Sequence, residues 1–146
     1  MSANGLEVFD RTVQVTNVWL DEIMEATGTE RRAAWQVLGA VLRAIRDQLP
    51  VDHSAHLSAQ LPLMVRGTFY DQWRPADVPD KIRDREAFLE RVAAGLSGNE
   101  AVDVERAARA VMATLERNID PGEARKVKES LHHDIRALWP ETQPAE

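Results

Sequence analysis

The chain has 146 residues, 18 of them basic and 24 acidic, with no cysteine and a formal net charge of −6. A chain of this length buries about 68 to 70% of its unfolded surface in one domain, so it can hold a core without metal or disulfide. The missing cysteines exclude thiolate chemistry, disulfides and cysteine-ligated zinc, and the acidic balance opposes DNA or another polyanion as a partner.

The first helix is predicted by one apolar stripe, whose members advance by four, three, four and three: Phe9, Val13, Thr16, Leu20 and Ile23. This spacing is typical of one face of an α-helix, and we expect the helix to cover about residues 6–26. Gly28 is expected to end it, because glycine readily adopts the left-handed conformation that closes helices. Thr29 is expected to cap the next helix through its hydroxyl.

A second stripe predicts a second helix that continues to Pro50: Ala34, Val37, Leu38, Val41, Leu42, Ile45 and Leu49. Asp52 is expected to cap a third helix. Pro62 is expected to break or kink that helix, because its ring clashes with the preceding turn and it has no amide hydrogen to donate. We expect the helix to restart toward Phe69.

Residues 67–79 carry one glycine, two prolines and three aromatic residues. Glycine and proline at this density indicate an irregular connection, so this segment is predicted to be an exposed linker between two helical units.

The second half of the chain predicts three further helices. The first covers about residues 80–96 and is followed by a break at Ser97-Gly98-Asn99, and the second covers 104–119. Asp120 is expected to cap the third, with Pro121 in its first position and Glu123 reaching back as in a capping box. This last helix is expected to end near Trp139, and residues 141–146 to form a frayed tail.

The second stripe recurs 70 residues later, in the residues Val104, Ala107, Ala108, Val111, Met112, Leu115 and Ile119. A further match joins Leu57, Leu61, Val65 and Arg66 to Val127, Leu131, Ile135 and Arg136. Only four positions are identical between 34–67 and 104–137, and any two amphipathic helices can be aligned. The hypothesis of a duplication therefore depends on the match of three consecutive helices.

We therefore predict an all-α fold: a single domain over residues 1–146, a compact bundle of about six to eight helices. It would consist of two pseudo-repeated three-helix units, at about 6–74 and 80–140, packed face to face. No run alternates with the period of two that is typical of a strand.

Two pairs of histidines carry potential metal ligands. His53 and His56 lie three residues apart and can share a helix face with the neighbouring Asp52, which would give a two-point grip on a metal ion. Zinc needs three or four ligands, and no motif supplies the rest, so a solvated helix start is the alternative. His132 and His133 are adjacent, and adjacent helical residues point about 100° apart, so we do not expect them to share a metal.

Two arginines at equivalent places precede aromatic residues: Arg66 comes before Tyr70 and Trp73, and Arg136 before Trp139. Guanidinium groups there could bind a carboxylate or phosphate, or stack on an indole. They could equally bond the carbonyl groups that helix ends leave open. These five residues are the candidates for an interaction or ligand site.

No motif of a nucleophilic or phosphate-binding site is present, since GxSxG, GxxxxGK and GxGxxG are all missing. We expect no enzymatic activity and no cofactor. No segment approaches the roughly 20 apolar residues of a membrane span, and residues 1–7 do not resemble an export signal. The expected location is the cytoplasm, without membrane contact.

The order of several short motifs resembles a family of small bacterial proteins catalogued as domain of unknown function 2267. The motifs span residues 9–140: Phe9-Asp10-Arg11-Thr12-Val13-Gln14, Trp19-Leu20, Ala40-Val41-Leu42-Arg43, Arg46-Asp47-Gln48-Leu49-Pro50, His56-Leu57, Ala59-Gln60-Leu61-Pro62, Arg66-Gly67, Tyr70, Trp73-Arg74-Pro75, Arg85-Glu86-Ala87-Phe88-Leu89, Pro121-Gly122-Glu123 and Arg136-Ala137-Leu138-Trp139-Pro140. The resemblance implies an all-helical domain without an established activity, cofactor or catalytic residue. The family pattern suggests Leu-Pro where this chain has Leu131-His132, so a softer helix break is expected there.

Three functional hypotheses follow. The first is a non-enzymatic interaction or regulatory module whose partner is a protein, including a second copy of this chain. The second is a small-ligand domain with an apolar cleft between the units, in which Arg66, Tyr70 or Arg136 holds an anionic head. The third is a metal site at His53 and His56.

Overall fold

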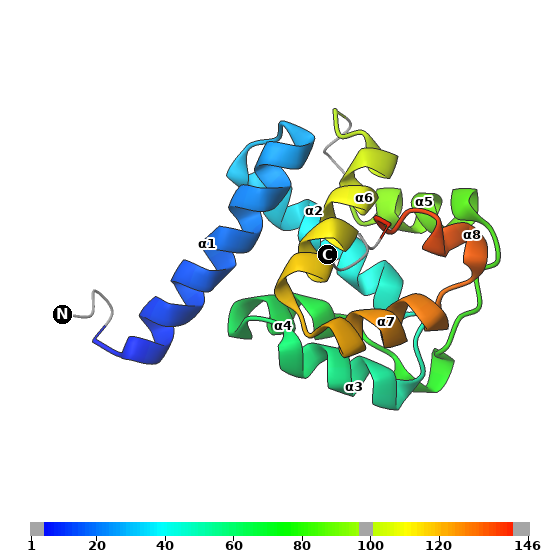
Figure 1. Cartoon of the computed structure of the whole chain (residues 1–146), viewed down its shortest axis with the longest axis horizontal. Helices are drawn as coiled ribbons and strands as arrows, with labels where there is room; N and C mark the ends of the chain where they lie inside the picture. Colours follow the sequence, from blue (N-terminus) through cyan, green and yellow to red (C-terminus); the bar gives the residue numbers. More distant parts are fainter. Residues whose placement is uncertain (1–4, 97–100, 142–146) are drawn as a thin grey trace, which may run out of the picture.

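A computed structural model describes residues 5–96 and 101–141. Within these ranges the chain forms helices and turns and no strand, so the predicted all-α class is confirmed (Figure 1). The helices in chain order are α1 (Glu7–Thr27), α2 (Arg31–Arg46), α3 (Val51–Gln60), α4 (Leu63–Tyr70), the 3-10 turn η1 (Pro75–Asp77), α5 (Arg85–Ala94), α6 (Val104–Asn118), α7 (Pro121–Ser130) and α8 (His133–Arg136).

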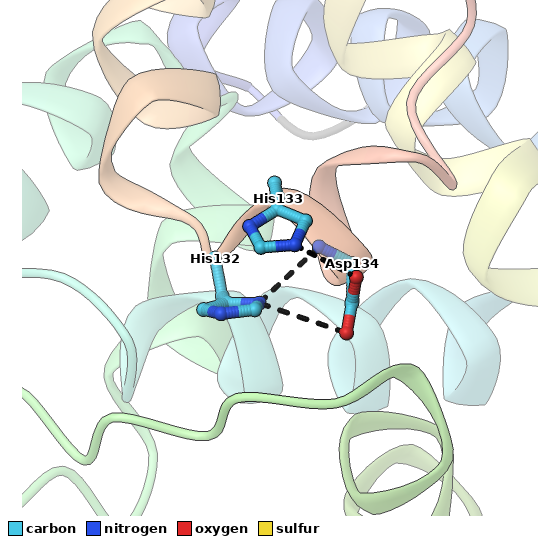
Figure 2. Close-up of side chains that lie close together, drawn as sticks. All are labelled: His132, His133 and Asp134. Atoms are coloured by element: carbon cyan, nitrogen blue, oxygen red, sulfur yellow. Dashed lines mark hydrogen bonds and ion pairs between the residues drawn. The ribbon is translucent and has the colours of Figure 1, made fainter.

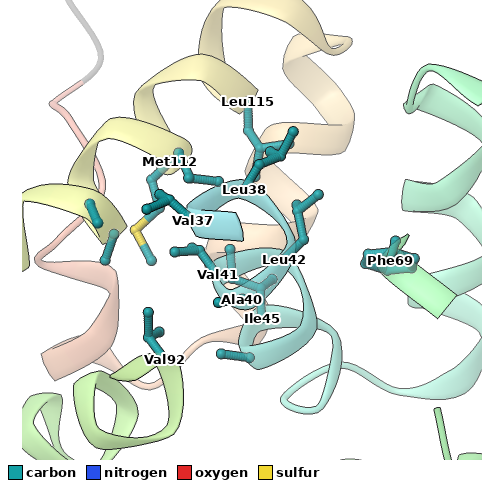
Figure 3. Close-up of a cluster of buried hydrophobic side chains, with 14 of the residues drawn as sticks. Val37, Leu38, Ala40, Val41, Leu42, Ile45, Phe69, Val92, Met112 and Leu115 are labelled. Atoms are coloured by element: carbon teal, nitrogen blue, oxygen red, sulfur yellow. The ribbon is translucent and has the colours of Figure 1, made fainter. Parts of the chain in front are cut away.

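Helix α2 forms the centre of the molecule. From Val37 to Arg46 every residue except Arg43 is buried, and α2 contacts α1, α4, α5 and α6. Figure 3 shows its apolar side chains surrounded by those of α4, α5 and α6. Val41 and its counterpart Val111 are both fully buried. The two predicted stripes are therefore the core, and each fully buried aliphatic side chain contributes about 1.5–3 kcal/mol of transfer free energy.

Contacts between the two halves of the chain are reciprocal. Helix α1 packs on α6, and α5 packs on α2. Helix α2 also packs on α6, and α3 on α7. The first helix of each half therefore lies on the second helix of the other half.

The join between α3 and α4 repeats almost unchanged between α7 and α8. Leu61 and Leu131 end their helices with φ/ψ of −86°/146° and −88°/142°. Pro62 and His132 then begin the next helix with −55°/149° and −57°/145°. The expected break at Pro62 is present. The expectation of a softer break at His132 is wrong, because the Nδ1 atom of His132 accepts the amide hydrogen of Asp134 (3.3 Å) and caps α8 without a proline.

The predicted helix caps are correct at Asp120 but wrong at two other helix starts. Asp120 accepts hydrogen bonds from the amides of Gly122 and Glu123. Its own amide donates to Gln60 Oε1 (3.2 Å), so Glu123 does not complete a capping box.

The two wrong caps are those of α2 and α3. These helices begin after Glu30 and Pro50, and neither has a side-chain cap. The Thr29 hydroxyl pairs instead with that of Thr27 (2.8 Å), and Asp52 already lies inside α3.

The connection between the halves is displaced from its predicted place. Helix α4 continues to Tyr70 and α5 starts only at Arg85, so the connection covers residues 71–84 rather than 67–79. The start of the predicted helix 80–96 is wrong, because Asp80 and Ile82 bond to residues that follow α2. The amide of Asp80 donates to the Asp47 carbonyl (2.6 Å) and that of Ile82 to Gln48 Oε1 (2.8 Å). Asp84 then caps α5.

The end of the chain also differs from its prediction, since α8 ends at Arg136 and a turn continues to Trp139. The predicted break at residues 97–99 and the predicted tail beyond Glu141 lie outside the described residues. No helix in the described ranges combines the length and apolarity that crossing a bilayer requires.

Candidate functional site

The apolar stripe of α1 lies half inside the core and half outside it. Thr16, Leu20 and Ile23 are buried, whereas Phe9 and Val13 are 48% and 40% exposed. Leu6 continues the spacing one step further and is 52% exposed. We call Leu6, Phe9 and Val13 the α1 seam. Figure 1 shows that the N-terminal turns of α1, which carry it, extend away from the other helices.

Most other exposed apolar side chains lie on α1 or at the start of α4. Of the nine large hydrophobic residues that are exposed in the described ranges, eight lie on α1, just before it or at the start of α4: Leu6, Val8, Phe9, Val13, Val15, Val18, Leu63 and Met64. Helix α4 is adjacent, since the amide of Met64 donates to Thr12 Oγ1 (3.3 Å). Scattered apolar residues are ordinary on a surface, but a concentration of this kind is typical of an interaction site.

Exposed charged residues occupy the side of α1 opposite the seam. Glu7 and Arg11 lie two residues before and two residues after Phe9, and residues two apart on a helix point about 160° apart. The sequence does not indicate that part of this stripe is exposed, because a buried stripe and an exposed one have the same apolar spacing.

The arginines Arg66 and Arg136 bond carbonyl groups at the ends of α3 and α7. The Arg66 Nε donates to the carbonyl of Ser58 (2.9 Å) and its Nη2 to that of Leu61 (3.4 Å). The Arg136 guanidinium makes the same two bonds 70 residues later, from Nε to Lys128 (2.8 Å) and from Nη2 to Leu131 (3.0 Å). Both guanidinium groups therefore satisfy the carbonyl of the leucine at the helix break. They also add a second hydrogen bond to the Ser58 and Lys128 carbonyls, which already accept the amides of Leu61 and Leu131.

The aromatic candidates are also engaged. Tyr70 donates its hydroxyl hydrogen to Ser58 Oγ (2.6 Å), and its ring lies 5.1 Å from that of Trp73. Trp139 is 5% exposed, and its Nε1 donates to Glu116 Oε2 (2.8 Å). In the described ranges no hydrogen bond or ring contact joins Tyr70 and Trp73 to Trp139.

Two further arginines, not singled out in the sequence, join α2 to α4. Arg46 is 3% exposed and donates to the carbonyls of Phe69 (2.8 Å) and Asp71 (2.6 Å). Arg43 donates to Thr68 Oγ1 (2.6 Å). Burial lowers the pKa of the Arg43 guanidinium, and the Asp71 carboxylate opposes that shift. Their position among apolar residues of α2 was the available signal.

Among the described residues, no group of three potential metal ligands includes His53 or His56. The Nδ1 atom of His53 lies 3.0 Å from Ser130 Oγ, and His56 is exposed. In the described residues, the group of three potential metal ligands that lie together is elsewhere, at His132, His133 and Asp134.

His132, His133 and Asp134 meet because His132 precedes α8 instead of lying within it (Figure 2). The expected separation of the two rings is therefore wrong: their centroids are 4.1 Å apart. The Nε2 atom of His133 lies 3.1 Å from Asp134 Oδ1. One ligand atom from each residue lies within 4.8 Å of the others, so the group could hold a cation, but His133 and Asp134 are largely exposed.

These features define an all-α protein built around α2, with an exposed apolar seam on its first helix. The chain belongs to the family described as uncharacterized conserved protein (DUF2267), whose model matches residues 16–138. The resemblance drawn from the sequence is thereby confirmed. No curated protein matches the chain. The match begins at Thr16, the first buried residue of the α1 stripe, so the α1 seam lies outside the matched range.

Proposed function

We propose that the protein is a non-enzymatic interaction module that pairs with a second copy of itself through the α1 seam. The observation that carries this proposal is that the apolar stripe of α1 continues beyond the core, with Phe9 and Val13 exposed. Alternating steps of three and four are the spacing of a coiled-coil seam, which fits another helix better than a flat surface.

A second copy of the chain carries the matching apolar stripe. In a two-fold contact each copy presents the same surface to the other, so Leu6, Phe9 and Val13 of one copy would cover those of its partner.

The test is sedimentation velocity of the full chain over a wide range of concentration. The wild type is expected to shift from monomer to dimer, and Phe9→Glu to stay monomeric at every concentration. Val51→Glu is the matched control, because Val51 is also exposed (43%) but lies on α3. A monomeric wild type, or equal loss in both variants, would overturn the proposal.

Other features support a non-enzymatic role. The candidates Arg66, Tyr70 and Arg136 use their polar groups in hydrogen bonds with the protein itself. The proposal has three further parts. The family resemblance favours a bacterial cytoplasmic location, and the reciprocal helix contacts favour an origin by duplication of a helical unit. The net charge of −6 argues against a nucleic-acid partner.

A further inference from the structure

A pocket of about 410 Å³ lies where three distant segments meet. Its walls are Gln48 and Pro50 between α2 and α3, the segment 79–83, and the join between α7 and α8. This volume is within the range of small-molecule sites. The pocket does not involve the α1 seam, so it is independent of the proposed dimer.

The charged lining of the pocket is cationic. Lys81 and Arg83 both face it, and no carboxylate is among the described residues that line it. Neither cation has an ion-pair partner in the described part of the chain. The two neighbouring carboxylates bond elsewhere: Asp80 pairs with Arg91 (2.6 Å), and Asp84 accepts the amide hydrogen of Ala87 (2.8 Å). Two unpaired cations at one pocket are notable in a chain with a net charge of −6.

Gln48 provides a second, independent sign of a ligand. It lines the pocket and is only 5% exposed. Its Oε1 accepts the amide hydrogen of Ile82 (2.8 Å), which fixes the orientation of the side-chain amide. The Nε2 atom is buried and has no hydrogen-bond partner. Native proteins rarely leave a buried donor unsatisfied, and an anionic group reaching this donor would satisfy it.

His132 and Ser130 add further polar groups. Because His132 Nδ1 accepts the amide hydrogen of Asp134, the neutral ring carries its hydrogen on Nε2, as a donor. The rest of the lining is apolar: Pro50, Pro79, Ile82 and Leu131. A ligand with an apolar part as well as a charge fits such a lining.

We propose that this pocket binds a small organic acid. Its anionic head, a carboxylate or a phosphate ester, lies between Lys81 and Arg83, and its short apolar body lies against the proline, isoleucine and leucine walls. Guanidinium and ammonium groups form their strongest hydrogen bonds with such anions. The residues differ from the sequence candidates Arg66, Tyr70 and Arg136, whose donors are already used.

Calorimetric titration of the full chain tests the pocket with four probes: hexanoate, hexyl phosphate, inorganic phosphate and 1-hexanol. We expect hexanoate or hexyl phosphate to bind, and whichever binds more tightly identifies the head group. 1-Hexanol is expected to bind at least tenfold more weakly, on the order of what a charged hydrogen bond contributes. Equal binding of 1-hexanol would overturn the anionic part of the proposal, and equal binding of inorganic phosphate would overturn the apolar part.

A double variant, Lys81→Gln with Arg83→Gln, is expected to lower the affinity by roughly tenfold or more. The matched control is Arg32→Gln with Lys126→Gln, which removes the same two charges from exposed positions on α2 and α7. Unchanged affinity in the first variant, or equal loss in both, would overturn the site.

Amide spectra of the wild type locate the ligand without any substitution. Addition of the bound probe should shift the side-chain amide resonance of Gln48 and the backbone amides of Ile82 and Leu131. Shifts confined to other parts of the chain would contradict the assignment of this pocket, even if calorimetry detects binding.

Discussion

His132 has the backbone conformation of a proline although it is a histidine. Its φ/ψ of −57°/145° differs little from that of Pro62, and Leu131 before it has the extended conformation that a proline requires of its neighbour. The same helix break is therefore achieved by two residues with different chemistry. At Pro62 the ring enforces the break, and at His132 the side chain caps the helix that follows.

We expect His132→Pro to change the free energy of unfolding by no more than about 1 kcal/mol. The lost cap of α8 and the reduced freedom of the unfolded chain act in opposite directions and are similar in size. Lys126→Pro, at an exposed position inside α7, should destabilise by about 3 kcal/mol or more. Urea unfolding followed by circular dichroism measures both. A large loss in His132→Pro would show that the backbone at this position is not proline-like.

For single residues, the sequence predicted where the arginines lie better than what their side chains bind. The 70-residue spacing placed Arg66 and Arg136 at equivalent sites, and carbonyl bonding was one of three alternatives for them. The choice among these depends on which acceptors lie nearby in space, and residues up to eight positions earlier supply them. Arg43 and Arg46 were missed, because the partners of their guanidinium groups are on α4.

Among the helices, the end of α5 lies close to α2. Gly95, the residue that follows α5, allows this approach because it has no side chain. A Cβ atom at Gly95 would lie 2.9 Å from Ala40 Cβ and 3.3 Å from the Val92 carbonyl oxygen. The Cβ atom of Ala40 and the carbonyl oxygen of Val92 are fixed by their helix backbones, so they cannot move aside as the end of a long side chain can. Gly67, within α4, has open space around the same position.

Gly95→Ala should therefore destabilise the protein by about 1–3 kcal/mol, because it overpacks the contact between α5 and α2. Gly67→Ala should stabilise it by about 0.5–1 kcal/mol, because alanine is the better helix former. The two substitutions add the same methyl group, so each is the control for the other in a urea titration. Effects of equal sign would contradict this account.

The sequence predicted that the helices exist, but it did not predict where they start. Apolar periodicity placed every long helix, because burial of one face determines that pattern. The start of α5 depends instead on hydrogen bonds from Asp80 and Ile82 to the residues after α2. Such contacts join residues more than 30 positions apart, and no local pattern indicates them.

For the molecule as a whole, the reciprocal contacts mean that neither half covers its own core. Helix α6 packs on both α1 and α2, and α2 packs on both α5 and α6. Separation of the halves would expose the central faces of α2 and α6 to water. These contacts also support the proposed duplication.

We expect the chain to unfold in one cooperative transition. Far-ultraviolet circular dichroism and tryptophan fluorescence should give coincident urea curves, as two-state unfolding requires. A fragment of residues 80–140 should show no cooperative transition, because it lacks the helices that cover α6. Independent folding of that fragment would contradict the single-domain prediction.

Fold class and core were accessible from the sequence at this scale, but neither site was. The pocket has walls from three separate segments, and the position of segment 79–83 depends on backbone bonds to the end of α2. The α1 seam has the same spacing as a buried stripe. Its exposure follows from where the other helices end.

That division of α1 has a consequence for its internal stability. In a chain that is not paired with a second copy, the backbone hydrogen bonds of α1 before Thr16 have little cover from other helices, whereas those around Leu20 and Ile23 are buried against α2 and α6. The outer amides should consequently open to solvent exchange by local fraying, and the inner ones only when the entire protein unfolds. One uninterrupted helix thus contains two regions that differ widely in protection.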